Sequence, residues 1–363
     1  MHAKMLSETP LNGMGYYAHN LMKGLAAVDK ANIYDLYSSG PIIHKVEGVN
    51  FRERVTGAPL FWTNLKLPRV LAREPHDIVF VPHEKLPPFV SGPKVITVYD
   101  LVPLRQYLRN PISMTAKLHF IKAITWTIKK ADAVLVISEA TKKSVLEVTG
   151  IDPGRITVTP LGYDTALFRP APAADCVRVR EKYGLSKDYF INTSSLLWYR
   201  KNLPGLIRAF AGSGARGAAR LVITGKSGMD YDNVMAAIRS LGLEDDVLIL
   251  GYVPLEDMPA LLGGAIGLAF PSLHEGFGLP IVEAFACGCP VMTSNCSSMP
   301  EVAGDAAILV DPLDEGAISG ALTRLASDSA LREELTKRGF ERARAFSWEK
   351  TAQLTLDVFE GFA

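Results

Sequence analysis

Ten short runs of apolar, largely β-branched residues recur along this chain, and most of them lead into a segment with helical periodicity. Such alternation is typical of βαβ units around a parallel sheet. Because the runs are apolar throughout and do not alternate with polar residues, helices are expected to cover both faces of each predicted strand. The predicted strands are residues 77–82, 94–99, 133–137, 156–160, 189–193, 220–224, 247–251, 265–270, 290–293 and 306–310.

The predicted strands form two series, separated by residues 162–174, a segment rich in Pro and Ala and poor in periodicity. A chain of 363 residues also exceeds what one hydrophobic core usually supports. The sequence therefore predicts two doubly wound α/β domains, 1–167 and 168–345. A last helix within 346–363 is expected to begin after the capping residue Ser347.

The composition, 48% hydrophobic and 21% charged, is typical of a soluble globular protein. No uninterrupted apolar run approaches the roughly 20 residues that a membrane-spanning helix needs. The first residues lack the apolar core and cleavage site of a signal peptide, so we expect a cytoplasmic protein. The four cysteines lack the paired spacing of a zinc site, and no metal is expected.

The segment 274–283 follows a predicted strand and combines two glycines with two glutamates. Ligands of open parallel sheets bind beyond the carboxyl ends of the strands, so this segment is the main candidate site. Two glycines beside Phe277, and Pro280 in the first helical turn, leave backbone amides available to an anion such as a diphosphate. Glu275 and Glu283 are spaced to hold two hydroxyl-rich parts of one ligand.

This pattern resembles the retaining glycosyltransferases of family 4, whose Glu-x7-Glu element reads Glu275 to Glu283 here. The resemblance is colinear and extends from near residue 11 to near residue 350. Further stretches that look like the family's motifs are 13–21, 134–141, 200–203 and 291–304.

The resemblance implies a fold of GT-B type, in which two Rossmann-like domains face each other across a cleft. The domain 1–167 would bind the acceptor, the domain 168–345 would bind the nucleotide sugar, and the helix in 346–363 would return to the first domain. No cofactor is implied, because the nucleotide sugar is a co-substrate.

Roles for single residues follow from the same resemblance. Glu283 would accept hydrogen bonds from the ribose hydroxyls, and Glu275 would hold hydroxyls of the transferred sugar. The residues expected at the diphosphate are Arg200 and Lys201, with Gly13 and Gly15 of the other domain. The backbone of Gly276, Phe277, Gly278 and Leu279 would complete the donor site.

Cleavage of a glycosyl phosphate bond leaves negative charge on the departing diphosphate, which fixed cations and amide dipoles stabilise. A metal ion is then unnecessary, and no Asp-x-Asp pair marks a metal site at a strand end. The resemblance further implies retention of the anomeric configuration.

The acceptor side departs from the family pattern at Tyr99, because relatives usually have His before the aspartate that is Asp100 here. His83 and Asp100 follow strands of the first series and are the best candidates for acceptor binding or catalysis. The run from Pro82 to Leu104 looks most like mannosyltransferases that use GDP-mannose.

Residues 115–131, from Thr115 to Ala131, form a predicted basic amphipathic helix. Its plain interpretation is a helix packed on the sheet with a solvated lysine face. The alternative interpretation is that the basic face of the helix binds anionic lipid at the inner side of the plasma membrane. Residues 1–170 contain 21 Lys and Arg against 14 Asp and Glu, and this excess of positive charge supports the second interpretation enough to leave both open.

The sequence as a whole predicts an enzyme that transfers a hexose, most readily mannose from GDP-mannose, to a glycan or polyprenyl-linked glycan acceptor in surface polysaccharide assembly. Nucleic acid is not an expected partner. One alternative is a sugar-nucleotide epimerase or phosphorylase on the same fold. Another is a non-catalytic subunit that binds carbohydrate or nucleotide.

Overall fold

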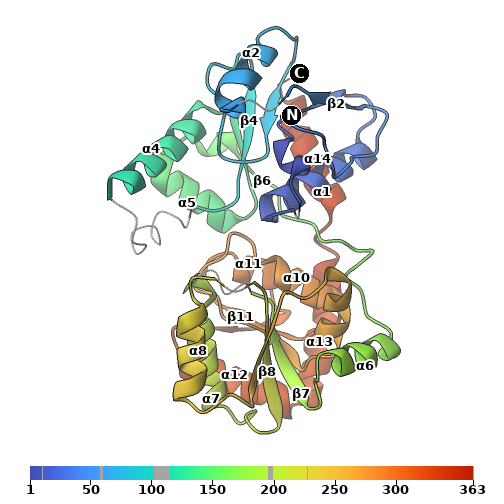
Figure 1. Cartoon of the computed structure of the whole chain (residues 1–363), viewed down its shortest axis with the longest axis vertical. Helices are drawn as coiled ribbons and strands as arrows, with labels where there is room; N and C mark the ends of the chain where they lie inside the picture. Colours follow the sequence, from blue (N-terminus) through green and yellow to red (C-terminus); the bar gives the residue numbers. More distant parts are fainter. Residues whose placement is uncertain (10, 58–59, 102–113, 195–198, 227, 363) are drawn as a thin grey trace. The chain divides into compact units, whose positions relative to one another are not determined.

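A computed structural model of the chain describes residues 1–363 except 10, 58–59, 102–113, 195–198, 227 and 363 (Figure 1). It also leaves out the side chains of 114–120. The described chain forms two compact units, one made of Met1–Gly162 with Ser347–Ala363 and the other of Tyr163–Phe346. The division lies a few residues before the predicted boundary at 167, and the last helix groups with the first unit.

The second unit contains a six-stranded parallel sheet in the order β12-β11-β10-β7-β8-β9. The chain runs outward from β7 to β9, then returns to the middle at β10 and runs outward again to β12. This is a Rossmann-like order, with its switch point between β7 and β10. The strands are β7 (Asp188–Asn192), β8 (Ala219–Thr224), β9 (Val247–Gly251), β10 (Gly267–Phe270), β11 (Val291–Ser294) and β12 (Ala307–Val310).

The first unit contains a four-stranded parallel sheet in the order β3-β4-β5-β6 and a parallel pair of strands, β1 and β2. Residues 1–3 connect the two, because the amide of His2 donates to the carbonyl of Phe80 and that of Ala3 to the carbonyl of Tyr37. The strands are β1 (Tyr34–Ser38), β2 (Phe51–Val55), β3 (Val79–Val81), β4 (Lys94–Val98), β5 (Ala133–Val136) and β6 (Ile156–Val158).

Each of the ten predicted runs overlaps one of the strands β3 to β12, and all are parallel to their neighbours, as the apolar pattern predicts. The prediction missed β1 and β2. Both contain charged residues, and β2 is largely exposed, so neither has the continuous apolar pattern of a strand covered on both faces.

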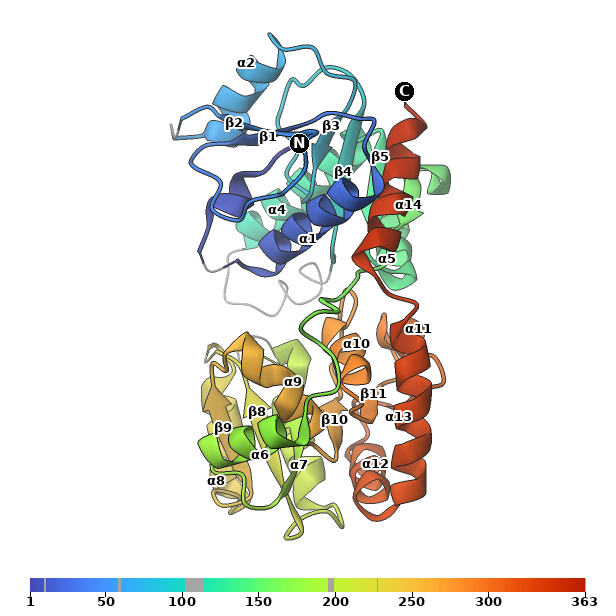
Figure 2. The same cartoon turned by 90° about the vertical axis from the view of Figure 1, so that its right-hand side faces the viewer.

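Helices lie on both sides of each sheet (Figure 2). Those of the first unit are α1 (Gly13–Val28), α2 (Leu67–Leu71), α4 (Met114–Lys130), α5 (Glu139–Thr149) and α14 (Trp348–Glu360), with short turns η1 (Lys4–Ser7) and η2 (Trp62–Lys66). Those of the second unit are α6 (Ala173–Lys182), α7 (Leu203–Ala211), α8 (Tyr231–Ser240), α9 (Met258–Gly263), α10 (Leu279–Ala286), α11 (Met299–Ala303), α12 (Glu315–Ser327) and α13 (Ser329–Ala343).

The last helix, α14, packs against α1 in both views (Figures 1 and 2). Its amino end is capped by Ser347, whose hydroxyl accepts the amide hydrogen of Lys350. The two helices approach so closely at Gly24 that a Cβ atom there would lie 2.6 Å from the carbonyl oxygen of Trp348. Glycine is therefore required for this close packing.

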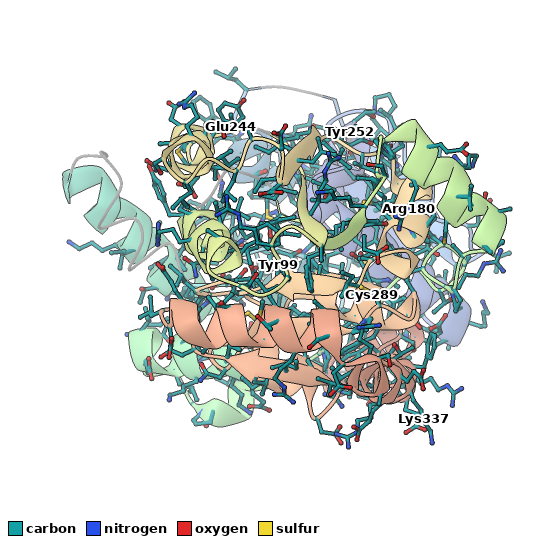
Figure 3. All side chains as sticks on the ribbon, turned by 90° about the horizontal axis from the view of Figure 1, so that it is seen from below. Tyr99, Arg180, Glu244, Tyr252, Cys289 and Lys337 are labelled. Atoms are coloured by element: carbon teal, nitrogen blue, oxygen red, sulfur yellow. The ribbon has the colours of Figure 1, made fainter. Side chains whose placement is uncertain are left out.

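The core of the second unit consists of aliphatic and aromatic side chains between the sheet and its helices. Cys289 lies inside this unit, whereas Glu244 and Lys337 extend from its periphery (Figure 3). No helix among the described residues is long and apolar enough to cross a bilayer.

Candidate functional site

Three of the predicted site residues of the second unit, Arg200, Lys201 and Glu275, are in contact at the switch point of its sheet. β7 and β10 are neighbours, with Phe190 opposite Gly267 and Ile191 opposite Leu268. Their carboxyl ends therefore lie at the same edge. The chain after β7 leads to Arg200 and the chain after β10 leads to Glu275, which is where open α/β sheets bind ligands.

Glu275 forms ion pairs with two cations, Arg200 and Lys201. Arg200 donates to its Oε2 at 2.6 Å and to the carbonyl oxygen of His274 at 3.0 Å. Lys201 donates to Oε1 at 2.7 Å, and its ammonium also lies over the ring of Phe270. Glu275 is only 6% exposed, so both carboxylate oxygens are held in a nearly dry environment.

The charge state of Glu275 depends on two opposing effects, burial and the neighbouring cations. Burial by itself would raise the pKa of this carboxyl, but the charges of Lys201 and Arg200 and a hydrogen bond from Lys201 outweigh it, so its pKa is lowered. Glu275 is therefore an ionised acceptor whose orientation is determined by two donors.

The loop after Glu275 ends at a helix start that no side chain caps. Gly278 precedes α10 with φ of +96°, a left-handed conformation that favours glycine. Pro280 lies in the first turn, where its missing N–H costs no intrahelical bond. The first amides of α10, which include that of Leu279, are thus at an end where a helix attracts anions.

Two serines that the sequence reasoning did not single out hold this loop. The Ser297 hydroxyl donates to the carbonyl oxygen of Glu275 at 2.7 Å. The Ser298 hydroxyl lies 2.9 Å from the carbonyl oxygens of both Glu275 and Phe277. Their position just after β11, at the same sheet edge, is the signal that could have identified them.

Glu283 lies in the first two turns of α10 and is in a different charge state from Glu275. Burial raises its pKa to about 8. Glu283 is thus protonated at neutral pH in the free protein, whereas Glu275 is ionised. The structure places both on the segment after β10, as the spacing predicts, and separates their electrostatic environments.

Some other polar atoms near this edge are buried and have no hydrogen-bond partner among the described residues. They include the hydroxyl oxygens of Thr193 and Ser194, directly after β7, and one carboxylate oxygen of Asp230, directly before α8. Burial also raises the pKa of Asp230. Orphaned buried polar atoms are rare in folded proteins, so their grouping favours a polar ligand at this end of the sheet.

In the first unit, Gly13 and Gly15 form the start of α1. The amide of Gly15 donates to the side chain of Asn12 at 2.9 Å, and a Cβ atom on Gly15 would lie 2.8 Å from Leu11. Gly13 has open space around it. The diphosphate contacts predicted for these glycines stay a prediction.

His83 lines a cavity of about 760 Å³ in the first unit. The cavity lies beyond the carboxyl ends of β1 and β3, and its wall includes residues from η1, η2 and the start of α1. Asp100, near the end of β4, is not among the described residues that line it. The structure therefore does not bring the two acceptor candidates into one cavity wall.

Tyr99 is engaged in packing. Its hydroxyl donates to the carbonyl oxygen of Pro82, and its ring meets that of Tyr17 edge to face at 5.0 Å. Burial, with the nearby Tyr17 and Glu84, raises its pKa well above the ordinary value. Tyr99 is thus a neutral donor that holds the backbone before His83, and it cannot serve as a base at neutral pH.

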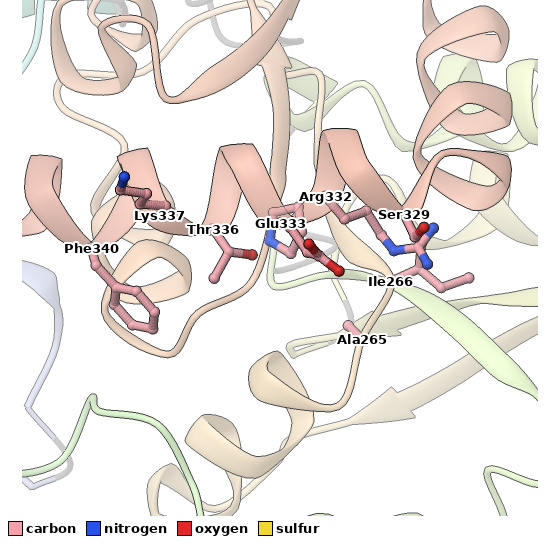
Figure 4. A pocket seen from close by; sticks show the side chains of 9 residues that line it. Ala265, Ile266, Ser329, Arg332, Glu333, Thr336, Lys337 and Phe340 are labelled. Atoms are coloured by element: carbon pink, nitrogen blue, oxygen red, sulfur yellow. The ribbon is translucent and has the colours of Figure 1, made fainter.

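A second cavity, of about 460 Å³, lies at the opposite end of the second sheet (Figure 4). Ala265 and Ile266 precede β10, and the facing wall is one side of α13 with Arg332, Thr336 and Phe340. Because ligands of parallel sheets bind at the carboxyl ends, this cavity is not the predicted donor site.

The basic helix predicted at 115–131 corresponds to α4, Met114–Lys130. The side chains of Lys117, Leu118 and Phe120 lie outside the described residues. Beyond them, Ile124 and Ile128 face the core, whereas Trp126 is 48% exposed. Lys122, Lys129 and Lys130 are also exposed.

Comparison with known families matches both units in turn. A model described as Glycosyltransferase Family 4 matches residues 11–167, and one described as Glycosyl transferases group 1 matches residues 178–342. Two parallel α/β units of this kind define the GT-B class of fold. The chain belongs to the family 4 glycosyltransferases.

Curated relatives carry mannosyltransferase names. The O-antigen chain mannosyltransferase B of Escherichia coli is 33% identical over 241 residues, 66% of this chain and 63% of the relative. The serotype-specific mannosyltransferase WbdA of the same organism is 31% identical over 274 residues, 73% of this chain and 33% of the relative. The chain thus aligns with less than two thirds of either relative.

Solved structures share the fold. The Anabaena protein Alr3699/HepE, crystallised with UDP and glucose, matches 99% of this chain and 98% of its own with a TM-score of 0.79 at 17% identity. WaaG, a glycosyltransferase involved in lipopolysaccharide biosynthesis, matches with a TM-score of 0.73 at 17% identity.

Proposed function

We propose that this protein is a retaining hexosyltransferase that moves mannose from GDP-mannose to a glycan or lipid-linked glycan acceptor during surface polysaccharide assembly. Family membership and the names of the relatives support the reaction class. The observation that carries the proposal is the buried Glu275 held between Arg200 and Lys201 at the switch point of the second sheet.

The chemistry of this site suits the departure of a nucleoside diphosphate. Arg200 and Lys201 are cations that contact Glu275, four residues before the uncapped start of α10, so they would stabilise the charge that develops on the leaving phosphate. Glu275, already ionised and oriented, would accept hydrogen bonds from the sugar hydroxyls. Glu283 and the orphaned polar atoms at the same edge would meet the nucleoside. In this scheme the protein cations supply the charge, and no metal is needed.

A panel of nucleotide sugars tests this proposal. A ligand that binds only the folded protein raises its melting temperature, so GDP-mannose should raise it more than UDP-glucose, UDP-galactose or ADP-glucose. GDP-mannose should also be consumed with a mannose-terminated glycan acceptor, and the rate should persist in EDTA. A preference for another nucleotide would overturn the donor assignment. Tight binding without turnover with any acceptor would favour the non-catalytic alternative.

The acceptor is proposed to be presented at a membrane surface. On α4, the exposed Trp126 lies on the same helix as the exposed Lys122, Lys129 and Lys130. Lysines attract anionic head groups and tryptophan favours the interface, so this end of α4 suits peripheral contact with the cytoplasmic leaflet.

Flotation with liposomes measures this contact. Vesicles that contain phosphatidylglycerol should recover several-fold more protein than neutral vesicles, and the triple substitution K122E, K129E and K130E should remove the difference. Substitution of the exposed Lys187 and Lys337 of the second unit is the charge control. Equal recovery with both kinds of vesicle would end the membrane proposal.

A further inference from the structure

The cavity around His83 contains a chain of hydrogen bonds whose direction can be worked out. The backbone amide of Lys85 donates to His83 Nδ1 at 3.0 Å, so this nitrogen is an acceptor. A neutral imidazole carries one proton, which must then be on His83 Nε2. That nitrogen lies 3.3 Å from His2 Nδ1 and donates to it.

The hydrogen bond from His83 also determines which nitrogen of His2 carries a proton. Because His2 Nδ1 accepts, the proton of His2 is on Nε2, which lies 3.4 Å from the hydroxyl oxygen of Thr63. The Thr63 hydroxyl oxygen accepts this hydrogen bond from His2, so its O–H group can donate a hydrogen bond to a second partner. The chain from Lys85 through His83 and His2 thus ends at a hydroxyl that lines the cavity and can donate to a ligand.

Both imidazoles are neutral. Burial, with the charge of Lys85, lowers the pKa of His83 to about 4. Burial and the neighbouring His83 lower the pKa of His2 well below its ordinary value. The ring of Trp62, whose indole N–H donates to Thr56, packs edge to face on His2 at 5.2 Å and holds it in place.

An exposed aromatic ring lies at the same cavity. Phe61 is 64% exposed and has φ of +61°, a conformation that bulky residues rarely adopt. Strained residues persist where the surrounding structure or a ligand requires them, and they cluster at binding sites. A ring held in this way offers a flat apolar surface to the C–H face of a sugar.

The charges around the cavity are balanced among its described residues. Lys4 and Lys85 are exposed at its edge, and Glu8 and Glu84 oppose them. Glu84 is the more buried of the two glutamates, and burial raises its pKa. A phosphate could pair with Lys4 or Lys85 at the edge, but inside the cavity it would meet this carboxyl and two buried, neutral imidazoles. A sugar hydroxyl could donate to the carboxyl.

We propose that this cavity binds a neutral sugar ring of the acceptor, which stacks on Phe61, accepts a hydrogen bond from Thr63 and donates one to Glu84. The inference rests on the proposed function and adds that the group recognised here is an uncharged sugar, not a phosphate ester. His83 and His2 are positioning residues that orient the Thr63 hydroxyl.

The first test measures the hydrogen-bond chain itself, without activity. Two-bond ¹H–¹⁵N correlation spectra of the whole protein at pH 7 should show His2 and His83 neutral, each with its proton on Nε2. The C2–H resonances of both should shift on addition of methyl α-D-mannopyranoside, and less with mannose 6-phosphate at equal concentration. The other tautomer at either residue, or a stronger response to the phosphate, would overturn the proposal.

The second test separates acceptor binding from the donor reaction. T63V should raise the acceptor KM about tenfold, the size of one lost hydrogen bond in a partly dry site, and T63S should restore it. F61A should raise KM similarly, and F61Y should retain the wild-type value. The exposed Thr165 of the second unit supplies the control T165V.

Binding of GDP and slow hydrolysis of GDP-mannose, measured alongside, should be unchanged in all of these variants. An unchanged acceptor KM in both T63V and F61A would refute the acceptor assignment while leaving the transferase intact. A wild-type protein that transfers no sugar would instead refute the proposed function, and the spectra would still report on the cavity.

Discussion

Replacement of Glu275 with alanine is expected to reduce transfer about a thousandfold without weakening the binding of GDP. The carboxylate is buried and accepts from both Arg200 and Lys201, so its removal takes away the negative charge that the two cations share. Loss of one member of a buried ion pair costs about 3–5 kcal/mol. Loss of the oriented acceptor removes contacts to the transferred sugar as well.

Nucleotide binding should respond in the opposite sense. In the free protein Glu275 engages both cations that we assign to the diphosphate. Without it, Arg200 and Lys201 are available to the phosphates, so the Kd of GDP should stay the same or fall. If Glu275 itself contributed to the binding of the nucleotide, E275A would instead lose affinity for GDP together with the rate of transfer.

Steady-state kinetics, titration calorimetry with GDP and thermal melts of E275A and E275Q measure these effects. K201A should slow transfer mainly through kcat, and the double variant E275A/K201A should lose less than the sum of both, because the two residues act as a pair. The exposed Glu341 on α13 supplies the control E341A. A weakened GDP complex in E275A would contradict the assignment of the cations to the diphosphate.

Replacement of Glu283 with glutamine is expected to stabilise the free protein at alkaline pH. Burial raises the pKa of Glu283 in the folded protein to about 8 from an ordinary value of 4.5. Between these values the folded state keeps a proton that the unfolded state releases. The contribution of Glu283 to the free energy of unfolding is therefore complete below pH 4.5 and falls as the pH rises towards 8.

The size of the effect is on the order of 2–4 kcal/mol at pH 8.5, which corresponds to several degrees in the melting temperature of a unit of this size. Glutamine is never ionised, so E283Q should lose this pH dependence. The difference in melting temperature between E283Q and the wild type should be near zero at pH 4.5 and largest above pH 8. A constant difference would contradict the raised pKa.

The same carboxyl should couple GDP binding to pH. If the ribose hydroxyls donate to an ionised Glu283, the complex favours loss of its proton, so binding at pH 7 should release protons and the affinity should rise towards pH 8. Calorimetry in buffers of different ionisation enthalpy measures this release. E283Q should bind GDP more weakly and release fewer protons, and E341Q is the matched control.

The apolar runs were enough to predict ten of the twelve strands among the described residues, and with them the four-stranded and six-stranded parallel sheets, because strands covered on both faces must be apolar throughout. They did not predict β1 and β2. The charged, exposed residues of β2 carry no such pattern, and among the described residues it is the pairing with β1 that makes this segment a strand.

At the candidate donor site, the position of Glu275 just after β10 and of Arg200 after β7 could be read from the sequence, because parallel strands place their carboxyl ends at one edge. The ion pairs could not be read from the sequence. Arg200 and Lys201 are 75 and 74 positions away from Glu275 in the chain, and the strand order is what brings them into contact. The sequence also suggested similar roles for two glutamates that differ in charge state.

What the sequence by itself determined is the class of fold and the location of the donor segment, since both follow from local pattern: apolar periodicity, glycines and the spacing of carboxylates. The tertiary structure decided the charge states of Glu275 and Glu283 and the role of Tyr99, and it brought His2, Thr63 and His83 together. The reason is physical. A pKa or the direction of a hydrogen bond depends on burial and on neighbours distant in the chain.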